Sequence, residues 1–272
     1  MRLFAIPYPA IDPVAVSLGP LTVRWYGLAY VAGLLLGWLY VRRLLAAREL
    51  WRDGKPPFAP AVTDDLFIWV AIGVVIGGRL GHVFFYEPVH YLSNPLQILM
   101  IHRGGMSFHG GMLGTIIAMW LFAIKRGVVP LTVMDLVATA TPLGLFFGRV
   151  ANFINAEVVG RPSTVPWAMV FPGYGPSPRH PSQLYEAMLE GVVLFFVLRW
   201  LTHTQRSLKY PGMVGGAFLA GYGAFRLFCE FFKEDEYQVF GSLPLTTGAI
   251  YSVPMILAGA LLMLRAERGR RP

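Results

Sequence analysis

Apolar residues gather in seven long stretches of the chain, and polar segments separate them. A helix that crosses the hydrocarbon core of a bilayer needs about 20 residues, and each stretch has that length or nearly so. Inside lipid a helix satisfies its own backbone hydrogen bonds, so the pattern predicts an all-α integral membrane protein with about seven transmembrane helices. The expected spans are Trp25–Val41, Leu66–Tyr86, Gly104–Ile124, Val128–Phe147, Leu184–Leu201, Met213–Phe232 and Leu243–Leu264.

Composition supports a membrane protein rather than a soluble one. Of the 272 residues, 55% are hydrophobic and 14% are charged, whereas a soluble domain carries about 25% charged residues. The single cysteine, Cys229, excludes an internal disulfide, and its surroundings offer no metal site. We expect it to be a buried structural thiol rather than a reactive one.

The basic residues predict the orientation of the bundle. More than half of the 23 Lys and Arg residues follow the first, third, fifth and seventh stretches. The positive-inside rule makes that side cytoplasmic, so the N-terminus is expected outside and the C-terminus inside. The net charge of +8 comes from these short clusters, which suit anionic lipid headgroups and not nucleic acid. The clusters are Arg42, Arg43, Arg48, Arg52 and Lys55; Lys125 and Arg126; Arg199, Arg206 and Lys209; and Arg265, Arg268, Arg270 and Arg271.

The remaining segments lie outside the spans. Residues 1–20 contain four prolines and lack the apolar core of a cleavable signal peptide, so we expect an irregular N-terminal arm, with the first span as the insertion signal. Residues 87–105 are expected to lie along the membrane surface. Residues 151–181, rich in Pro and Gly, are expected to form a small extracytoplasmic cap of irregular structure or short strands. Residues 1–272 are otherwise predicted to be a single polytopic membrane domain.

Polar side chains converge on the outer ends of the expected helices. Ionisable residues in membrane helices are costly and are functional candidates by default. On the sixth helix, Arg226 lies about 20 Å into a core of about 30 Å, which places it in the outer leaflet. Cationic groups at the level of the headgroups suit a phosphate, and the planar fork of arginine suits it best. The converging residues are Tyr26, Arg79, His82, His109, Arg149 and Arg226.

Simpler roles remain open for several of these residues. Arg149 closes the fourth stretch and is either an interfacial anchor or a phosphate ligand. Arg226 is too deep to reach the interface easily and is expected to point inward, where Glu230 lies one turn further on. Arg79 is either functional or a structural partner of another helix.

For His109 a structural role competes with a catalytic one, and Tyr26 also fits an aromatic belt. Asp135 and Glu190 are either pathway carboxylates or members of buried pairs. Glycine pairs at four-residue spacing indicate helix packing; they are Gly33/Gly37, Gly73/Gly77 and Gly77/Gly81.

Five sequence blocks together resemble the bacterial prolipoprotein diacylglyceryl transferases. The most specific is "GRVANFINAEVVGRP", Gly148–Pro162, which fixes Arg149, Asn152, Glu157 and Gly160. The others are "RWYGL", "GGMSFHGGMLG", "RHPSQLYEA" and "GYGAFRLFCEFF", and all five stand in the order of that family. The blocks run from about residue 24 to residue 232, so the resemblance covers most of the chain.

This resemblance implies a reaction and a set of site residues. The family transfers the diacylglyceryl group of phosphatidylglycerol to the thiol of the lipobox cysteine in a preprolipoprotein, and glycerol phosphate leaves. No cofactor or metal is implied, and Arg103 is given no role. The family's catalytic positions fall on Tyr26, His109, Arg149, Tyr222 and Arg226, and its phosphatidylglycerol-binding positions on Arg149, Asn152, Glu157, Gly160 and Arg226.

The chemistry of this reaction is compatible with the polar residues. The substrate supplies the thiol nucleophile, so the enzyme needs no nucleophile of its own. A thiol with a pKa of about 8.5 is only a few per cent ionised at neutral pH, so a base or a positive field must favour the thiolate. Arginines in a low-dielectric site would stabilise the leaving phosphate. The main alternative is a transporter or flippase for an anionic lipid or small anion, but a path across the membrane should carry polar residues at all depths.

Overall fold

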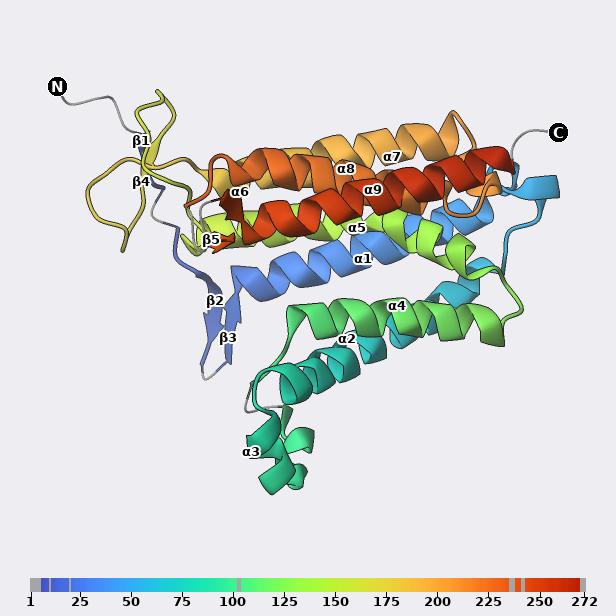
Figure 1. Cartoon of the computed structure of the whole chain (residues 1–272), viewed down its shortest axis with the longest axis horizontal. Helices are drawn as coiled ribbons and strands as arrows, with labels where there is room; N and C mark the ends of the chain where they lie inside the picture. Colours follow the sequence, from blue (N-terminus) through green and yellow to red (C-terminus); the bar gives the residue numbers. More distant parts are fainter. Residues whose placement is uncertain are drawn as a thin grey trace.

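The structure, a computed structural model, describes residues 6–9, 11–19, 21–101, 104–234, 238–240 and 243–269. Arg103, Arg270 and Arg271 lie outside these residues. The described chain is mostly helical, and its long helices run side by side along one axis (Figure 1). They are α1 (Trp25–Ala46), α2 (Thr63–Phe85), α4 (Phe108–Lys125), α5 (Pro130–Ile154), α6 (Ser182–Glu186) continued by a π-helical segment (Ala187–Val193) and α7 (Leu194–His203), α8 (Met213–Glu230) and α9 (Thr247–Arg268).

Each of the seven predicted stretches overlaps one of these helices or the continuous helix that includes α6 and α7. Within the described residues, five helices are long and apolar enough to cross a membrane, namely α1, α2, α4, α5 and α9. We call the continuous helix made of α6, the π-helical segment and α7 the rod. Most of the charged residues of the site described below lie on the rod and on the neighbouring helix α8. The described helices are therefore compatible with the predicted helical membrane protein.

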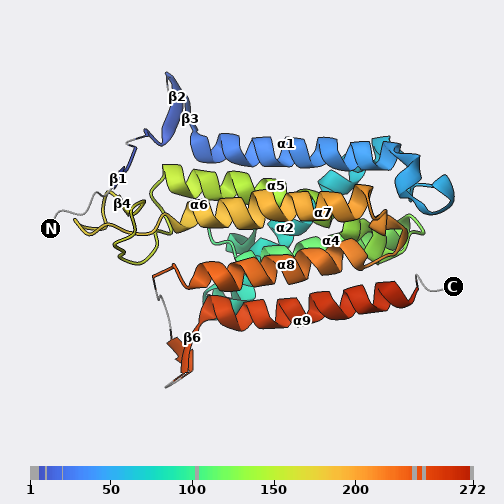
Figure 2. The same cartoon turned by 90° about the horizontal axis from the view of Figure 1, so that it is seen from above.

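Helix α5 lies at the centre of the bundle. It packs along α1 and also contacts α4, α8 and the α6–α7 rod. Two helix pairs flank this centre, α2 with α4 and α8 with α9. Seen from above, five elements follow one another across the molecule in the order α1, α5, the rod, α8 and α9 (Figure 2). Residues far apart in the sequence can therefore meet between α5, the rod and α8.

Glycines let α2 and α4 approach closely, as their spacing predicts. A Cβ atom added to Gly73 would lie 2.6 Å from the carbonyl oxygen of Gly114, and one added to Gly81 would lie 2.6 Å from the Cα atom of Gly110. A larger side chain at either position would push the two backbones apart.

The two ends of the bundle differ. Among the described residues there are three two-stranded sheets, and all lie at the end that holds the N-terminus, which we call the cap end (Figure 1). The C-terminus and the connections that follow α1, α4 and the rod lie at the opposite end (Figure 1). The sheets pair β1 (Ile6–Pro7) with β4 (Met169–Val170), β2 (Val14–Leu18) with β3 (Leu21–Arg24), and β5 (Gln238–Phe240) with β6 (Leu243–Thr246).

Two helix boundaries differ from the prediction. Helix α5 continues to Ile154 instead of ending at Phe147, so Arg149 and Asn152 lie on its last turns. It can continue because the polar residues alternate with Ala151 and Phe153, which stay buried. Helix α4 begins at Phe108 and not at Gly104. Gly104 has a φ of 86°, which a helix cannot use, and the side chain of Ser107 caps the helix by accepting a hydrogen bond from the Gly110 backbone.

Residues 155–181 form a largely irregular segment at the cap end, and it starts four residues later than the predicted cap because α5 is longer. A small apolar core of Phe153, Val159 and Phe171 holds it on the end of α5. Residues 87–101 fold into α3 (Pro88–Ser93) and a short 3₁₀ helix (Pro95–Leu99). Both segments are thus built of short pieces that pack on the ends of long helices.

Candidate functional site

Two buried glutamates lie at the centre of the candidate site. Glu186 ends α6, Glu190 lies in the π-helical segment, and both side chains are 0% exposed. Arg149 of α5 contacts both of them: one guanidinium nitrogen lies 3.1 Å from Oε2 of Glu186 and the other 3.3 Å from Oε2 of Glu190. The fork of this arginine therefore bridges two successive turns of the neighbouring helix.

Arg226 reaches the same carboxylate from α8. Its Nη1 atom donates to Oε1 of Glu186 at 2.6 Å, and its Nη2 atom lies 3.6 Å from Oε2 of Glu230. Lys233, beyond the end of α8, donates to the same Oε1 atom of Glu186 at 3.0 Å. Glu186 thus joins three cations from three parts of the chain, and the expected pairing of Arg226 with Glu230 is confirmed.

The charges in this cluster balance. Glu186, Glu190 and Glu230 face Arg149, Arg226 and Lys233, so each buried carboxylate has a cationic partner, as burial requires. Hydrogen-bonding capacity is nevertheless left over. One oxygen of each glutamate lacks a hydrogen-bond partner within the described chain. The Oε2 atom of Glu186 is among them although it lies 3.1 Å from Arg149, so this contact is an ion pair without hydrogen-bond alignment.

Tyr222 borders the cluster. It lies one turn before Arg226 on α8 and interacts electrostatically with Glu190, Arg149 and Arg226. The structure therefore brings together three of the predicted site residues, Arg149, Tyr222 and Arg226.

Asn152, Asn155 and Glu157 form a second polar group next to the first. The Nδ2 atom of Asn152 donates to Oε2 of Glu157 at 3.1 Å, and that of Asn155 donates to Oε1 at 3.3 Å. The backbone N–H of Glu157 also donates to the Asn152 carbonyl oxygen. The Glu157 carboxylate is therefore folded back over the end of α5.

The backbone around Glu157 is strained. Ala156 has a φ of 53° and Val158 a φ of 54°, and a β-branched residue in the left-handed region is a rare and costly exception. Two neighbours from α6 hold this turn. Gln183 donates its amide to the Glu157 carbonyl oxygen at 2.6 Å, and the Ser182 hydroxyl donates to the Val158 carbonyl oxygen at 3.0 Å. Strain maintained in this way is typical of a functional site.

Tyr26, at the start of α1, lies near this second group. It interacts electrostatically with Glu157 and Arg149, and its hydroxyl lies 3.2 Å from that of Tyr30. Tyr26 therefore connects the first turn of α1 with the end of α5.

His109 is not hydrogen-bonded to either group among the described residues. It is exposed in the first turn of α4, and its ring lies 5.3 Å from that of Tyr251 on α9.

Gly160 occupies a crossing of backbones. A Cβ atom there would lie 2.5 Å from the carbonyl oxygen of Phe232 and 2.7 Å from that of His180. Protein backbone therefore lies directly against Gly160, which holds the irregular segment against the end of α8.

Arg79 and Asp135 bind backbone groups. The Arg79 guanidinium donates to the carbonyl oxygens of Gln97, Ile98, Gly104 and Gly105 and so closes the loop between α2 and α4. Asp135 accepts hydrogen bonds from the backbone N–H groups of Gly212 and Gly215 at 2.7 and 2.6 Å, which caps the start of α8. Cys229 is buried, as expected for a structural thiol.

Sequence reasoning did not identify Glu186, Gln183 and Lys233. Glu186 and Glu190 are four residues apart in a predicted helix, a spacing that places two carboxylates on one face. That signal was present in the sequence but received no role.

Within the described residues, a bundle of packed helices, five of them long and apolar enough to span a bilayer, and a set of paired charges at one end define a multi-pass membrane protein with a polar site. A sequence model of the family described as prolipoprotein diacylglyceryl transferase matches residues 13–265. The chain belongs to this family and is therefore a transferase, as the sequence blocks suggested.

Similar proteins support this assignment over nearly the whole chain. A protein of Rhizobium meliloti is 54% identical over 270 residues, which are 98% of this chain and 96% of that protein. One from Mesorhizobium japonicum is 52% identical over 270 residues, covering 98% and 94%, and one from Brucella canis is 54% identical over 267 residues, covering 97% and 95%. All three are named phosphatidylglycerol–prolipoprotein diacylglyceryl transferase.

Proposed function

We propose that the chain transfers the diacylglyceryl group of phosphatidylglycerol to the thiol of the lipobox cysteine of a preprolipoprotein. The sulfur forms a thioether bond to the glyceryl carbon, the bond from that carbon to the phosphate oxygen breaks, and glycerol phosphate leaves with the electron pair. The observation that carries this proposal is the meeting of Arg149 and Arg226 on one buried carboxylate, Glu186, at the cap end.

The two arginines bind the phosphate of the lipid in this proposal. A guanidinium has five N–H donors in a fixed fork. The contacts with the glutamates orient Arg149 and Arg226 and leave donors for a further anion. When the carbon–oxygen bond breaks, negative charge grows on the phosphate. Arginines that are already oriented in a low-dielectric site stabilise this charge without reorganising, an effect often worth several kcal/mol.

Asn152 and Glu157 bind the glycerol end of the headgroup. Asn152 lies about one helical turn beyond Arg149, which matches a hydroxyl-bearing group attached to the bound phosphate. Its amide donates to Glu157, which leaves the amide oxygen free to accept a hydroxyl, and Glu157 has carboxylate oxygens that accept as well. Tyr26 and Tyr222 complete the walls on the sides of α1 and α8.

The thiol proton has two candidate acceptors, His109 and the unpartnered Oε1 atom of Glu190. The cations of the cluster favour the thiolate in either case. If His109 is the base, His109→Gln lowers turnover strongly while phosphatidylglycerol binding persists. If His109 only packs on Tyr251, the variant keeps most of its turnover, which is the outcome we expect. Loss of lipid binding in the variant would contradict both roles.

The proposed topology has seven spans, with the cap end and the N-terminus outside a bacterial inner membrane and the C-terminus in the cytoplasm. Its support is that the rod and α8 run along the same axis as the five apolar helices (Figure 1). The connections that carry the basic clusters lie at the opposite end (Figure 1). A reporter fused near Pro176 should be extracytoplasmic and one fused at Pro272 cytoplasmic. The reverse at either position would contradict the topology.

The decisive experiment is to incubate the purified protein with phosphatidylglycerol and a lipobox peptide. Mass spectrometry should find a diacylglyceryl adduct on the peptide thiol and an equal amount of free glycerol phosphate. Arg149→Ala is the matched negative control. An unmodified peptide with folded protein would favour the transport alternative.

A further inference from the structure

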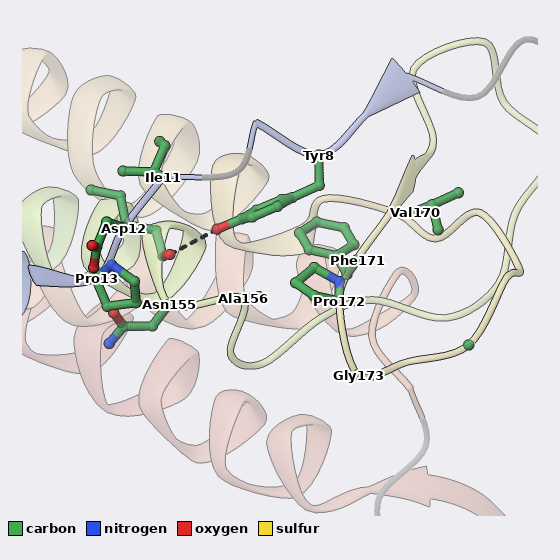
Figure 3. A pocket seen from close by; sticks show the side chains of 12 residues that line it. Tyr8, Ile11, Asp12, Pro13, Asn155, Ala156, Val170, Phe171, Pro172 and Gly173 are labelled. Atoms are coloured by element: carbon green, nitrogen blue, oxygen red, sulfur yellow. Dashed lines mark hydrogen bonds between the residues drawn. The ribbon is translucent and has the colours of Figure 1, made fainter.

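A pocket of about 760 Å³ lies at the cap end beside the candidate site. Three distant segments build it: the N-terminal arm, the end of α5 and the loop that follows β4 (Figure 3). Its walls are mostly apolar, with Ile11, Phe171 and Pro172, and two polar side chains, Asp12 and Asn155, lie close together at one side (Figure 3). A volume of this size is typical of pockets that hold a small molecule or a few residues of peptide.

The pocket is a built feature. The Tyr8 hydroxyl lies 2.8 and 2.7 Å from the carbonyl oxygens of Phe153 and Ile154, so its one proton is shared between two carbonyls of the last turn of α5. Burial raises the pKa of Tyr8, so this hydroxyl remains a donor. Parallel pairing of β1 with β4 fixes the arm to the loop on the other side. The arm is thereby fixed on the helix that carries Arg149.

The pocket adjoins the site at Asn155. This residue lines the pocket and also donates to Glu157, which in turn accepts from Asn152. Asn155 follows Arg149 by a rise of about 9 Å along the helix axis. An extended peptide rises about 3.3 Å per residue, so a chain leaving the reacting group reaches the pocket after about three residues.

We infer that this pocket binds the polypeptide of the acceptor, at the residues that follow the modified cysteine. This inference rests on the proposed function and adds to it a site for the protein part of the acceptor. The walls fit such an occupant because they combine apolar surface with two polar side chains. A roomy apolar pocket tolerates different side chains, while Asp12 and Asn155 offer an acceptor and a donor to peptide groups. The only partner of the Asp12 carboxylate among the described residues is the Val14 backbone N–H.

The test compares two acceptor peptides that share the same lipobox. One ends at the cysteine, and the other continues for about six residues, enough to fill the pocket. With the wild-type protein the longer acceptor should have the lower KM. Ile11→Trp fills the pocket, and Ile11 is 37% exposed, so the change should not disturb folding. It should raise the KM of the longer acceptor about fivefold or more and leave the KM of the short acceptor and of phosphatidylglycerol unchanged.

The matched control is Val16→Trp, an equally large change on β2 at a residue that is 49% exposed and does not line the pocket. It should behave like the wild type. A photoreactive residue at position 11 should cross-link to the second to fourth residues after the cysteine. An equal effect of Ile11→Trp on both acceptors, a changed KM for phosphatidylglycerol, or cross-links only before the cysteine would reject the inference. If the wild type modifies neither acceptor, the proposed function itself fails.

Discussion

Two buried acids contact α8 in opposite ways, and the contrast separates a structural acid from a functional one. At the end away from the cap, Asp135 is 1% exposed and each of its oxygens accepts a backbone N–H group near the start of α8. At the cap end, Glu186 is 0% exposed and binds the side chains of Arg149, Arg226 and Lys233. Backbone donors stay in place once a helix forms, whereas side chains can exchange one anion for another.

The two acids differ also in the polar capacity that surrounds them. Both oxygens of Asp135 are satisfied, whereas Glu186 and its neighbour Glu190 each keep an oxygen without a hydrogen-bond partner within the described chain. Buried polar atoms are normally satisfied, so such atoms mark a place where a further partner belongs. We therefore expect changes at Glu186 to alter activity and changes at Asp135 to alter stability.

The largest expected effect is at Arg149. Arg149→Ala should lower kcat/KM by about 10²- to 10³-fold because it removes donors to the leaving phosphate. Arg149→Lys keeps the charge but not the fork, so it should retain lipid binding and lose most of its rate. In a double-mutant cycle with Arg226→Ala, residues that share one phosphate should couple by about 0.5–3 kcal/mol. Strict additivity, or full activity of Arg149→Lys, would return Arg149 to the role of an interfacial anchor.

Glu186→Gln should have the second largest effect, and it should change kcat and KM in different ways. The variant has one negative charge fewer among three cations, so the KM for phosphatidylglycerol should fall. Arg149 and Arg226 are no longer held by a shared carboxylate, so kcat should fall by about 10- to 100-fold. The measurement is steady-state kinetics with folding confirmed by a thermal transition. A fall in kcat together with a rise in the KM for phosphatidylglycerol would indicate a general packing defect instead.

Asp135→Asn tests the other half of the contrast. The amide can accept only one of the two backbone N–H groups and brings two donors into their place, which should lower the free energy of unfolding by about 1–3 kcal/mol. The kcat/KM of the folded fraction should stay near the wild-type value. Thermal unfolding in detergent together with activity per folded molecule measures both quantities. A large loss of activity at unchanged stability would place Asp135 in the reaction.

The smallest effect should come from His180, which holds the irregular segment. Burial and then Arg161 lower the pKa of His180, whose side chain is 7% exposed and shares a hydrogen bond with the Tyr185 hydroxyl. The unfolded state therefore binds a proton on this histidine at a higher pH than the folded state does. The free energy of unfolding should then fall as the pH drops below about 6.5. His180→Gln should flatten the pH dependence of unfolding in that range. An unchanged dependence in the variant would assign it to another group.

The apolar stretches of the sequence were enough to predict the long helices and the end of the bundle at which the site lies. The last turns of α5 were missed because Arg149, Asn152 and Asn155 look like the end of an apolar helix, although Ala151 and Phe153 keep it buried. The two positive φ angles at Ala156 and Val158 had no signal, since neither residue favours them.

Contacts between distant segments were the least predictable part. Arg79 looked like a candidate ligand because sequence does not show that four carbonyl oxygens of a loop surround it. Glu186 received no role for the corresponding reason, since its three cations come from α5, α8 and the residues after α8. Spacing along one helix predicts which residues share a face, but it does not predict what that face meets.

The π-helical segment makes the rod sensitive to its length. Such a segment accommodates an extra residue in an α-helix, and each residue turns an α-helix by about 100°. Deleting one residue from Ala187–Val193 would restore a regular helix and rotate Glu186 away from Arg149 and Arg226, while the apolar side of α7 with Leu194 and Leu198 stayed in place. Gly191, whose Cβ atom would lie 2.7 Å from that of Phe146, fixes where the change of register occurs. Insertions and deletions should therefore be far rarer in this segment than substitutions.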